Sequence, residues 1–283
     1  MPEGPETHRQ AHKLRDLLLH QIPVLEIEYP ALQGPLSLLR GQRVTAVEAK
    51  GKAFLIEFES RQTLYAHMQL YGRWQMVPPG HQPKTNRQLR LRLGTANGDA
   101  LLYSATDLEV LNPNQRSTHP YLSRLGPDLL APESSPQILY RQLLDRRFSG
   151  RQLSGLLLDQ TFWAGPGNYL RSEILFCAGL TPQTRPKDLT PETGDRLTLV
   201  AQGLARRSLL TGGLTQHPLR VQQLKAQKLP RRQYRHWVFG RAQQPCGLCG
   251  QIIVKEDWNG RRLYRCSSCA GGSGLTLDFS EVQ

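Results

Sequence analysis

The chain has 283 residues, 39% of them hydrophobic, and a formal net charge of +13 at pH 7. This length suffices for two domains of ordinary size, and the hydrophobic fraction excludes a wholly disordered chain. No run of about 18 apolar residues occurs, so no membrane span is expected. The first residues are charged and lack the apolar stretch of a signal peptide, so we expect a cytoplasmic protein.

The first half of the chain predicts one helix followed by β-structure. Residues Glu6–His20 place Ala11, Leu14, Leu17 and Leu18 on one stripe, which indicates a helix. Eight short segments rich in β-formers follow, separated by turn residues, and this spacing predicts an antiparallel sandwich or barrel. The segments are Val24–Tyr29, Arg43–Val47, Ala53–Phe58, Thr63–Ala66, Gly72–Met76, Gln88–Leu93, Leu101–Ser104 and Leu108–Leu111.

The second half predicts helices and then a cysteine-bearing hairpin. Residues 211–230 are weakly periodic and predict a mobile loop, and the Gly/Ser-rich end predicts disorder. The fold class is therefore α+β. We divide the chain into a β-sandwich domain (1–125), a linker (126–135), a helical domain (136–220), a basic loop with the cysteines (221–270) and a disordered tail (271–283). The expected helices are Gln137–Asp145, Leu153–Gln160, Tyr169–Ala178 and Thr190–Leu210.

The positive charge is concentrated near the end of the chain. Between His217 and Arg265 there are eleven Lys/Arg residues and two acidic ones, so this segment supplies +9 of the +13. Such a surplus favours a polyanionic partner, with nucleic acid first. Ordinary solubilising charge is the alternative, and composition does not separate DNA from RNA or an acidic protein.

Four of the five cysteines form two Cys-x2-Cys pairs, Cys246/Cys249 and Cys266/Cys269, separated by sixteen residues. Two such turns can complete a tetrahedron of thiolates, so the spacing predicts one zinc ion. Because all four ligands are thiolates, no position is open for substrate and the site is structural. Arg261 and Arg262 lie near the tip of the hairpin between the pairs, where a guanidinium can bind phosphate or merely solubilise the tip.

The N-terminus carries a possible nucleophile. Removal of Met1 would leave Pro2 as a free secondary amine, which can attack an aldehyde carbon and form an iminium. Glu3 follows it as a possible general acid/base. Pro and Glu are also common where a helix begins, so these two residues taken alone favour an ordinary helix start over catalysis.

Four motifs taken together indicate a family. They are Met1-Pro2-Glu3-Gly4-Pro5-Glu6, Gly51-Lys52, Gly165-Pro166-Gly167-Asn168-Tyr169 and the closing cysteine hairpin, in this order. The chain resembles the formamidopyrimidine-DNA glycosylase / endonuclease VIII family from Pro2 to Cys269. The segment Gln69-Leu70-Tyr71 is similar to the wedge of the endonuclease VIII branch.

The resemblance implies a β-sandwich domain and a helical domain with a helix-two-turn-helix and a zinc hairpin. It implies a monomeric base-excision-repair enzyme, a bifunctional DNA glycosylase and abasic-site lyase, acting on double-stranded DNA that contains oxidised pyrimidines or abasic sites. Chemistry would proceed through an iminium at Pro2, followed by β,δ-elimination. In the cytoplasm such an enzyme would associate with the nucleoid.

The resemblance also implies residue roles. Pro2 would be the nucleophile, Glu3 the acid/base, and Lys52 a phosphate contact that assists the amine. Asn168 and Arg261 would bind phosphates around the kinked duplex. Gln69, Leu70 and Tyr71 would fill the gap left by the flipped nucleotide, and Glu6 and Glu173 would organise the site.

Three other functions fit part of the sequence. One is excision of oxidised purines by an enzyme of the same family. The second is a zinc-finger DNA-binding protein without enzymatic activity, which the presence of both Pro2 and Glu3 argues against. The third is a zinc-ribbon transcription accessory protein, which explains the cysteines and the charge but not the N-terminus or the Gly167-Asn168 turn.

Overall fold

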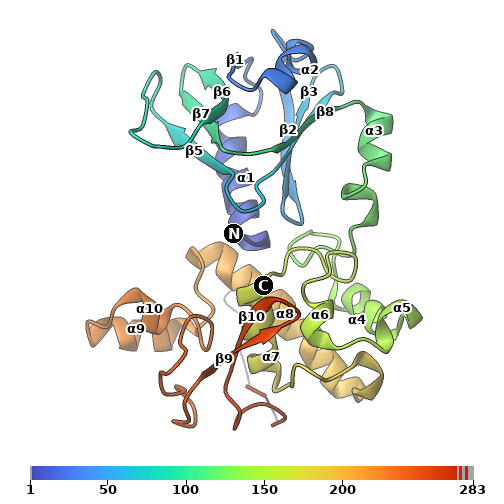
Figure 1. Ribbon diagram of the computed structural model, residues 1–283, viewed down its shortest axis with the longest axis vertical. Helices are drawn as coiled ribbons and strands as arrows, with labels where there is room; N and C mark the ends of the chain where they lie inside the picture. The colour runs from blue at the N-terminus through green and yellow to red at the C-terminus, as the bar shows by residue number, and fades with distance from the viewer. Residues whose placement is uncertain (1, 273, 276–277, 280–283) are drawn as a thin grey trace. The chain divides into compact units, whose positions relative to one another are not determined.

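The computed structural model describes residues 2–272, 274–275 and 278–279 (Figure 1). The chain forms two compact units. The first contains residues 1–2 and 6–124, and the second contains residues 3–5 and 125–283. The short segment Glu3–Pro5 thus belongs to the second unit by its contacts, although it begins the first helix, α1 (Gly4–Leu18).

The first unit is a β-sandwich of two four-stranded antiparallel sheets, ordered β1-β6-β7-β5 and β2-β3-β4-β8. Short helical segments η1 (Pro30–Leu32), α2 (Gln33–Ser37), α3 (Pro113–Thr118) and η2 (Leu122–Arg124) join or follow the strands. The antiparallel sandwich predicted from the sequence is confirmed. The strands are β1 (Val24–Ile27), β2 (Val44–Lys50), β3 (Ala53–Phe58), β4 (Thr63–His67), β5 (Arg73–Val77), β6 (Leu89–Thr95), β7 (Gly98–Tyr103) and β8 (Asp107–Leu111).

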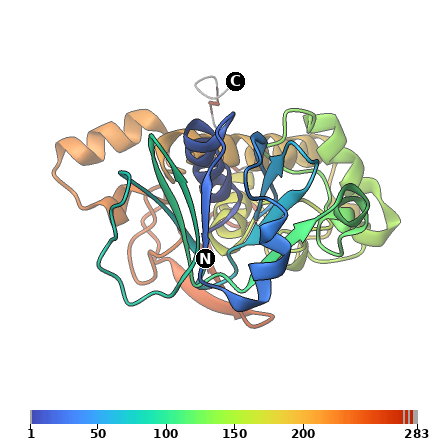
Figure 2. The ribbon, with the colours of Figure 1, turned by 90° about the horizontal axis from the view of Figure 1, so that it is seen from above.

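Alternation along β3 explains how the sandwich is packed. Phe54, Ile56 and Phe58 face the main core, which α1 enters through Leu14 and Leu18. In both ribbon views α1 lies between the two sheets (Figures 1 and 2). The alternate residues Ala53 and Leu55 face a smaller cluster with Tyr65 and Leu111, against which Tyr121 and Leu122 pack. Because successive strand residues point to opposite faces, β3 is buried on both sides.

The second unit is helical and ends in a two-stranded hairpin, β9 (Val254–Trp258) paired with β10 (Arg261–Arg265). Buried side chains of the helices and of the hairpin share one core, so the hairpin is packed rather than separate. The helices are α4 (Pro136–Leu144), α5 (Arg146–Ser149), α6 (Leu153–Leu156), α7 (Asn168–Ala178), α8 (Pro191–Thr211), α9 (Pro218–Ala226) and α10 (Arg231–Tyr234), with η3 (Pro186–Asp188) before α8.

Two elements of this unit differ from the expectation. The helix expected at Leu153–Gln160 is α6, which ends at Leu156 and is followed by turns; in one of them Asp159 accepts N–H and O–H bonds from Thr161. The segment expected to be a mobile loop contains α9. His217 caps α9 by accepting the N–H of Leu219, and Val221 is buried, so a single apolar anchor and a cap suffice.

The segment expected to link the domains is held against the second unit. Gly126 donates to the carbonyl of Gln160 at 2.9 Å, and Ala164 donates to Pro127 at 2.9 Å. A Cβ at Gly126 would lie 2.5 Å from the carbonyl oxygens of Thr161 and Phe162. This close approach of two backbones explains the glycine.

The tail expected to be disordered spans 271–283, of which residues 273, 276–277 and 280–283 lie outside the described residues. The described ones contact the helical core. Gly271 donates to Gly179 at 2.9 Å, and Leu275 donates to the carbonyl of Cys177 at 2.8 Å. The ring of Phe279 lies against Gly203 in α8, with the guanidinium of Arg207 4.5 Å from the ring centre.

Candidate active site

The carboxylate of Glu3 is bound at the N-terminus of α7. Its Oε2 accepts N–H bonds from Gly167 at 2.7 Å and Leu170 at 3.1 Å, and its Oε1 accepts one from Tyr169 at 2.8 Å. Glu3 is only 5% exposed. Unpaired first-turn amides and the positive end of the helix dipole both stabilise a negative charge. The carboxylate is therefore fixed in position, and the amides that hold it favour its negative charge.

Glycines provide the space for this contact. A Cβ at Gly167 would lie 2.5 Å from the carboxyl carbon of Glu3, and a Cβ at Gly4 would lie 2.8 Å from the Cα of Gly165. Gly4 also donates to the carbonyl of Gly165 at 2.8 Å. The amides of residues 167, 169 and 170 can therefore reach the Glu3 carboxylate at hydrogen-bond distance.

Asn168 and Arg261, the two expected phosphate contacts, come from elements that are tied together. Asn168 begins α7 and is partly exposed, while Arg261 begins β10 and is exposed. Ser172 Oγ donates to the carbonyl of Asn168 at 2.9 Å and accepts the N–H of Tyr264 at 3.2 Å. This hydroxyl therefore joins the start of α7 to the hairpin strand.

A buried arginine makes the second connection between α7 and the hairpin. Arg171 is 1% exposed and donates to the carbonyls of Ser154 at 3.1 Å, Arg261 at 3.3 Å and Arg262 at 2.9 Å. Burial lowers the pKa of Arg171 to about 10, and the nearby charge of Glu3 opposes that shift. The group is thus charged at neutral pH, and it fixes the backbone from which the Arg261 side chain extends.

Glu173 organises a different segment. Its carboxylate is fully buried and accepts the Thr215 hydroxyl as well as the N–H groups of Trp237 at 2.7 Å and of Val238 and Phe239 at 2.9 Å each. Burial raises the pKa of Glu173, and these four hydrogen bonds oppose the shift. The carboxylate therefore holds two parts of the chain after α8, Thr215 and residues 237–239, against α7.

His236, which had no predicted role, joins this network through the hydroxyl of Thr215. Its ring is stacked on Tyr169 with centroids 5.1 Å apart, and its Nδ1 is 3.2 Å from the hydroxyl of Thr215. Burial, together with the smaller effects of the Arg235 and Arg231 charges, lowers the pKa of His236 to about 3. A neutral histidine thus joins the Glu173 network to Tyr169, whose N–H binds Glu3. A lone histidine between Arg235 and Trp237 belongs to no motif from which this role could be predicted.

The four cysteines meet at the base of the hairpin. All four Sγ atoms lie within 4.8 Å of one another, and the shortest separations are 3.3 Å for Cys249–Cys266 and 3.5 Å for Cys249–Cys269. Zn–S bonds of about 2.3 Å in a tetrahedron give S–S distances of about 3.8 Å. The cluster can therefore bind one metal ion with four sulfur ligands.

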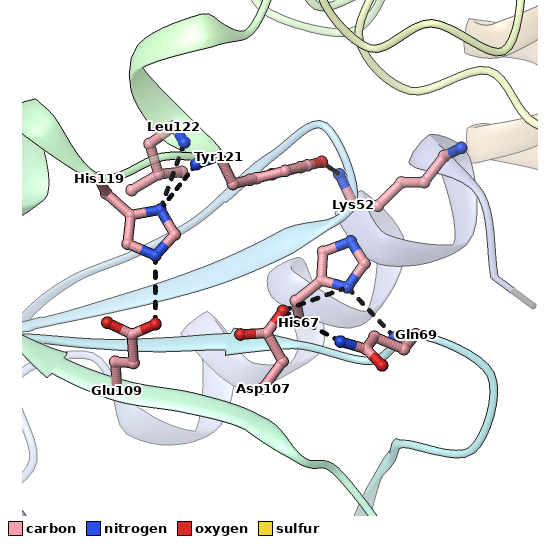
Figure 3. A network of polar contacts seen from close by, with 8 residues as sticks. All are labelled: Lys52, His67, Gln69, Asp107, Glu109, His119, Tyr121 and Leu122. Carbon is pink, nitrogen blue, oxygen red and sulfur yellow. Dashed lines mark hydrogen bonds and ion pairs between the residues drawn. The ribbon is translucent and has the colours of Figure 1, made fainter.

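The first unit carries Pro2, Glu6, Lys52 and the segment Gln69–Tyr71. Pro2 is partly buried and Glu6 lies in the first turn of α1. Lys52 lies at the tip of the β2–β3 hairpin after Gly51, whose φ of +59° suits glycine. The backbone N–H of Lys52 donates to the hydroxyl of Tyr121 at 3.0 Å (Figure 3).

The predicted wedge lies in the turn after β4. Leu70 and Tyr71 are 61% and 70% exposed, unlike the apolar residues of the core. Gln69 has a φ of +45°, and its N–H donates to His67 Nδ1 at 3.2 Å while its side-chain amide donates to Asp107 at 3.3 Å. Burial lowers the pKa of His67; Asp107 opposes this and Lys52 reinforces it. A neutral His67 therefore accepts the bond that supports the turn (Figure 3).

The expected site residues thus fall into two groups. Glu3, Asn168, Glu173, Arg261 and the four cysteines share the second unit, and the structure joins them through α7 and its hydrogen bonds. Pro2, Glu6, Lys52 and Gln69–Tyr71 share the first. The sequence missed the residues that support them, among them His67, Tyr121 and Arg171.

A family model and curated relatives match the chain. Residues 1–106 match the model of the formamidopyrimidine-DNA glycosylase N-terminal domain. The protein named Endonuclease 8 of Escherichia coli (strain UTI89 / UPEC) is 43% identical over 271 residues, which cover 95% of this chain and 99% of that protein. Endonuclease 8 of Shigella sonnei (strain Ss046) matches with the same identity and coverage.

Solved structures show the same fold. A Lactococcus lactis Fpg in complex with DNA containing N7-benzyl-Fapy-dG superposes with a TM-score of 0.78 and 20% identity, covering 96% of this chain and all of that one. A complex of Lactococcus lactis Fpg with abasic-site DNA gives a TM-score of 0.77, covering 94% and 98%. The fold and the relatives define a class of base-excision DNA glycosylases with abasic-site lyase activity. The chain belongs to the formamidopyrimidine-DNA glycosylase / endonuclease VIII family, and within it to the endonuclease VIII branch.

Proposed function

We propose that this chain excises oxidised pyrimidines from double-stranded DNA and cleaves the backbone at the resulting abasic site, with Pro2 as nucleophile. The observation that carries the proposal is the Glu3 carboxylate, held by three backbone N–H groups directly after Pro2. The preference for pyrimidines rests on the 43% identity to proteins named Endonuclease 8.

In the proposed first step, with Met1 removed, the Pro2 amine attacks C1′ of the damaged nucleotide. The glycosidic bond breaks, and its electron pair leaves with the base, which takes a proton from solvent. A carboxylate fixed beside Pro2 can accept the proton that the amine loses and return it to O4′ when the sugar ring opens. The carbon C1′ is then joined to the Pro2 nitrogen as an iminium.

The second step cleaves the backbone. The iminium acidifies the C2′ hydrogens, so loss of one as a proton expels the 3′ phosphate. Loss of a C4′ proton then expels the 5′ phosphate, and hydrolysis of the iminium frees the sugar fragment. Lys52 would contact a phosphate next to the lesion and assist the amine, and Asn168 and Arg261 would hold phosphates of the kinked strand.

Flipping a base out of the duplex costs roughly a few kcal/mol. It also leaves a gap in the stack of bases, which protein side chains can fill. Leu70 and Tyr71 suit this role because they are large, apolar and exposed. Glu6 and Glu173 would act as supporting residues. Glu173 is fully buried and binds Thr215 and the backbone of residues 237–239, so its contribution would be to hold the loop that follows α8.

Zinc is the metal we propose for the four-cysteine cluster, in a structural role and one per chain. All four ligands are thiolates, which leaves no open coordination position. The metal would hold the β9–β10 hairpin, and with it Arg261. We also propose that the protein acts as a monomer in the cytoplasm at the nucleoid, where its DNA substrate lies. Among the described residues, no helix is long and apolar enough to cross a membrane.

Borohydride trapping tests the chemistry. Purified protein is mixed with a duplex that contains one abasic site, sodium borohydride is added, and the adduct is mapped by mass spectrometry. We expect a covalent complex at Pro2 in a chain without Met1. If folded, metal-loaded protein gives no adduct, the non-enzymatic DNA-binding alternative replaces this proposal.

Base release tests the specificity. Matched duplexes carry thymine glycol or 8-oxoguanine, and single-turnover release is measured for each. We expect faster release of thymine glycol. Faster release of 8-oxoguanine opposite cytosine would instead assign the chain to oxidised purines while leaving the Pro2 chemistry unchanged.

A further inference from the structure

The tip of the β2–β3 hairpin is held by a hydrogen bond to a residue outside the two strands. The last paired residues are Lys50 and Ala53, so Gly51 and Lys52 project beyond the register. The N–H of Lys52 donates to the Tyr121 hydroxyl at 3.0 Å, across 69 residues of sequence. This hydrogen bond fixes the backbone of Lys52, and with it the position of the Cα from which the side chain extends.

Tyr121 is itself fixed by a buried histidine. His119 is 7% exposed, and its Nδ1 accepts the N–H of Tyr121 at 3.2 Å and of Leu122 at 3.4 Å. Its Nε2 lies 3.4 Å from Glu109, and its ring lies 4.4 Å from that of Tyr65. Because Nδ1 accepts, the ring proton is on Nε2 and points to Glu109 (Figure 3).

The ring of Tyr121 also contacts the support of the wedge. It meets the His67 ring edge-on with centroids 5.1 Å apart, and His67 accepts the N–H of Gln69. One side chain therefore contacts both the lysine turn, through its hydroxyl, and the histidine under Gln69, through its ring. Figure 3 shows the Tyr121 hydroxyl at the backbone nitrogen of Lys52, with the His67 ring close by.

We propose that Tyr121 is a positioning residue for Lys52, with its hydroxyl fixing the Gly51–Lys52 turn and His119 fixing Tyr121. This rests on the role proposed above for Lys52. A lysine side chain has several rotatable bonds, so a defined backbone origin limits the volume that its ammonium explores. Small misplacements of a positioning group cost disproportionately in rate. The hydroxyl therefore contributes to the rate of the lysine-dependent step rather than to folding.

The test removes only this hydroxyl, with Tyr121→Phe, and leaves the ring contacts in place. Hydrogen–deuterium exchange of the peptide that contains Lys52 reports on the bond directly. Single-turnover borohydride trapping on abasic DNA reports on its consequence, with the rate constant and the final trapped fraction measured separately. Tyr65→Phe is the matched control, because its ring packs on His119 and Tyr121 but its hydroxyl is not the acceptor of the Lys52 amide.

For Tyr121→Phe we expect faster exchange at Lys52 and a trapping rate constant about three- to tenfold lower, as for one lost hydrogen bond. The trapped fraction and Tm should stay as in wild type, and Tyr65→Phe should change neither the exchange nor the rate. In a Lys52→Met background the same substitution should have no further effect on the rate.

Unchanged exchange and rate in Tyr121→Phe would overturn the inference. So would an equal fold-loss in the Lys52→Met background, or a loss confined to the trapped fraction and Tm, since these indicate a role in folding alone. The proposed function fails differently, since wild-type protein would then give no adduct at all. The exchange measurement still decides whether Tyr121 fixes the turn in that case.

Discussion

At the scale of single residues, the position of Gly167 is explained by a carboxylate and not by backbone conformation. Its φ of −138° is open to any residue, so the turn itself does not require glycine. What requires it is the Glu3 side chain, packed where a Cβ would be. The glycine and the catalytic candidate are 164 residues apart, so the constraint exists only in the folded chain.

Gly167→Ala should therefore displace Glu3 and lower the rate of borohydride trapping by at least about tenfold, because a misplaced acid/base loses its geometry. Gly155→Ala is the matched control, since a Cβ there meets nothing within 4 Å. The rate constant at saturating DNA is the measurement. Equal rates for the two variants would show that Glu3 does not need this position.

His236 makes stability depend on pH. Its pKa is about 3 in the folded protein against 6.5 unperturbed, so the unfolded chain binds the extra proton between these values. Stability is fully present above pH 6.5 and is lost as the pH falls towards 3, by at most about 1.4 kcal/mol per pH unit. Denaturant unfolding from pH 7 to 4 measures this slope.

His236→Asn should be less stable at pH 7, because it loses the stacking on Tyr169, but its stability should fall less steeply with decreasing pH. The exposed His81→Asn should keep the wild-type slope. If the slope of His236→Asn equals that of wild type, another group is responsible for the acid sensitivity.

At the scale of elements, α7 organises the second unit. Its N-terminus binds Glu3, its first turn is tied to β10 through Ser172 and Arg171, and Glu173 holds the loop after α8. Ten of the eleven residues of α7 are buried, so the helix has no single apolar face. Its sequence therefore does not indicate which elements pack against which side of it.

Phe279 packs on α8. Gly203 leaves room for the Phe279 ring, and Arg207 lies against that ring. Phe279→Ala should lower the free energy of unfolding by about 1–3 kcal/mol, since Phe279 is partly buried and loses apolar contacts. Thermal or denaturant unfolding measures the change.

Leu144→Ala is the control for Phe279→Ala, because Leu144 is 66% exposed and should change stability by less than about 0.5 kcal/mol. A Phe279→Ala variant as stable as this control would show that Phe279 contributes no packing energy in solution.

At the scale of the whole molecule, the affinity for DNA should depend on the metal bound by the four cysteines. Structural zinc contributes folding energy outright. Removing it should release the β9–β10 hairpin, lower DNA affinity by at least about tenfold and reduce the salt dependence of binding, because the Arg261 phosphate contact is lost. Zinc release is measured with a chromogenic chelator and affinity by titration at several salt concentrations.

Cys249→Ser should reproduce the effect of zinc removal, while Cys177→Ala should retain one zinc per chain, since Cys177 is buried in the helical core and is not one of the four clustered cysteines. A protein that releases no metal on denaturation and binds DNA equally well after chelation would contradict the proposed structural zinc.

The sequence by itself determined the β-sandwich, the main helices and the cysteine cluster, because local periodicity and ligand spacing encode these features directly. It also pointed to Glu3 and Lys52 through short motifs. Only the tertiary structure decided that Glu3 binds the α7 amides, that Tyr121 holds the Lys52 turn and that Arg171 joins α7 to the hairpin. These are single contacts between residues distant in sequence, and such contacts leave no local periodicity. For the same reason local periodicity predicted neither α9 nor the contact of Phe279 with Arg207.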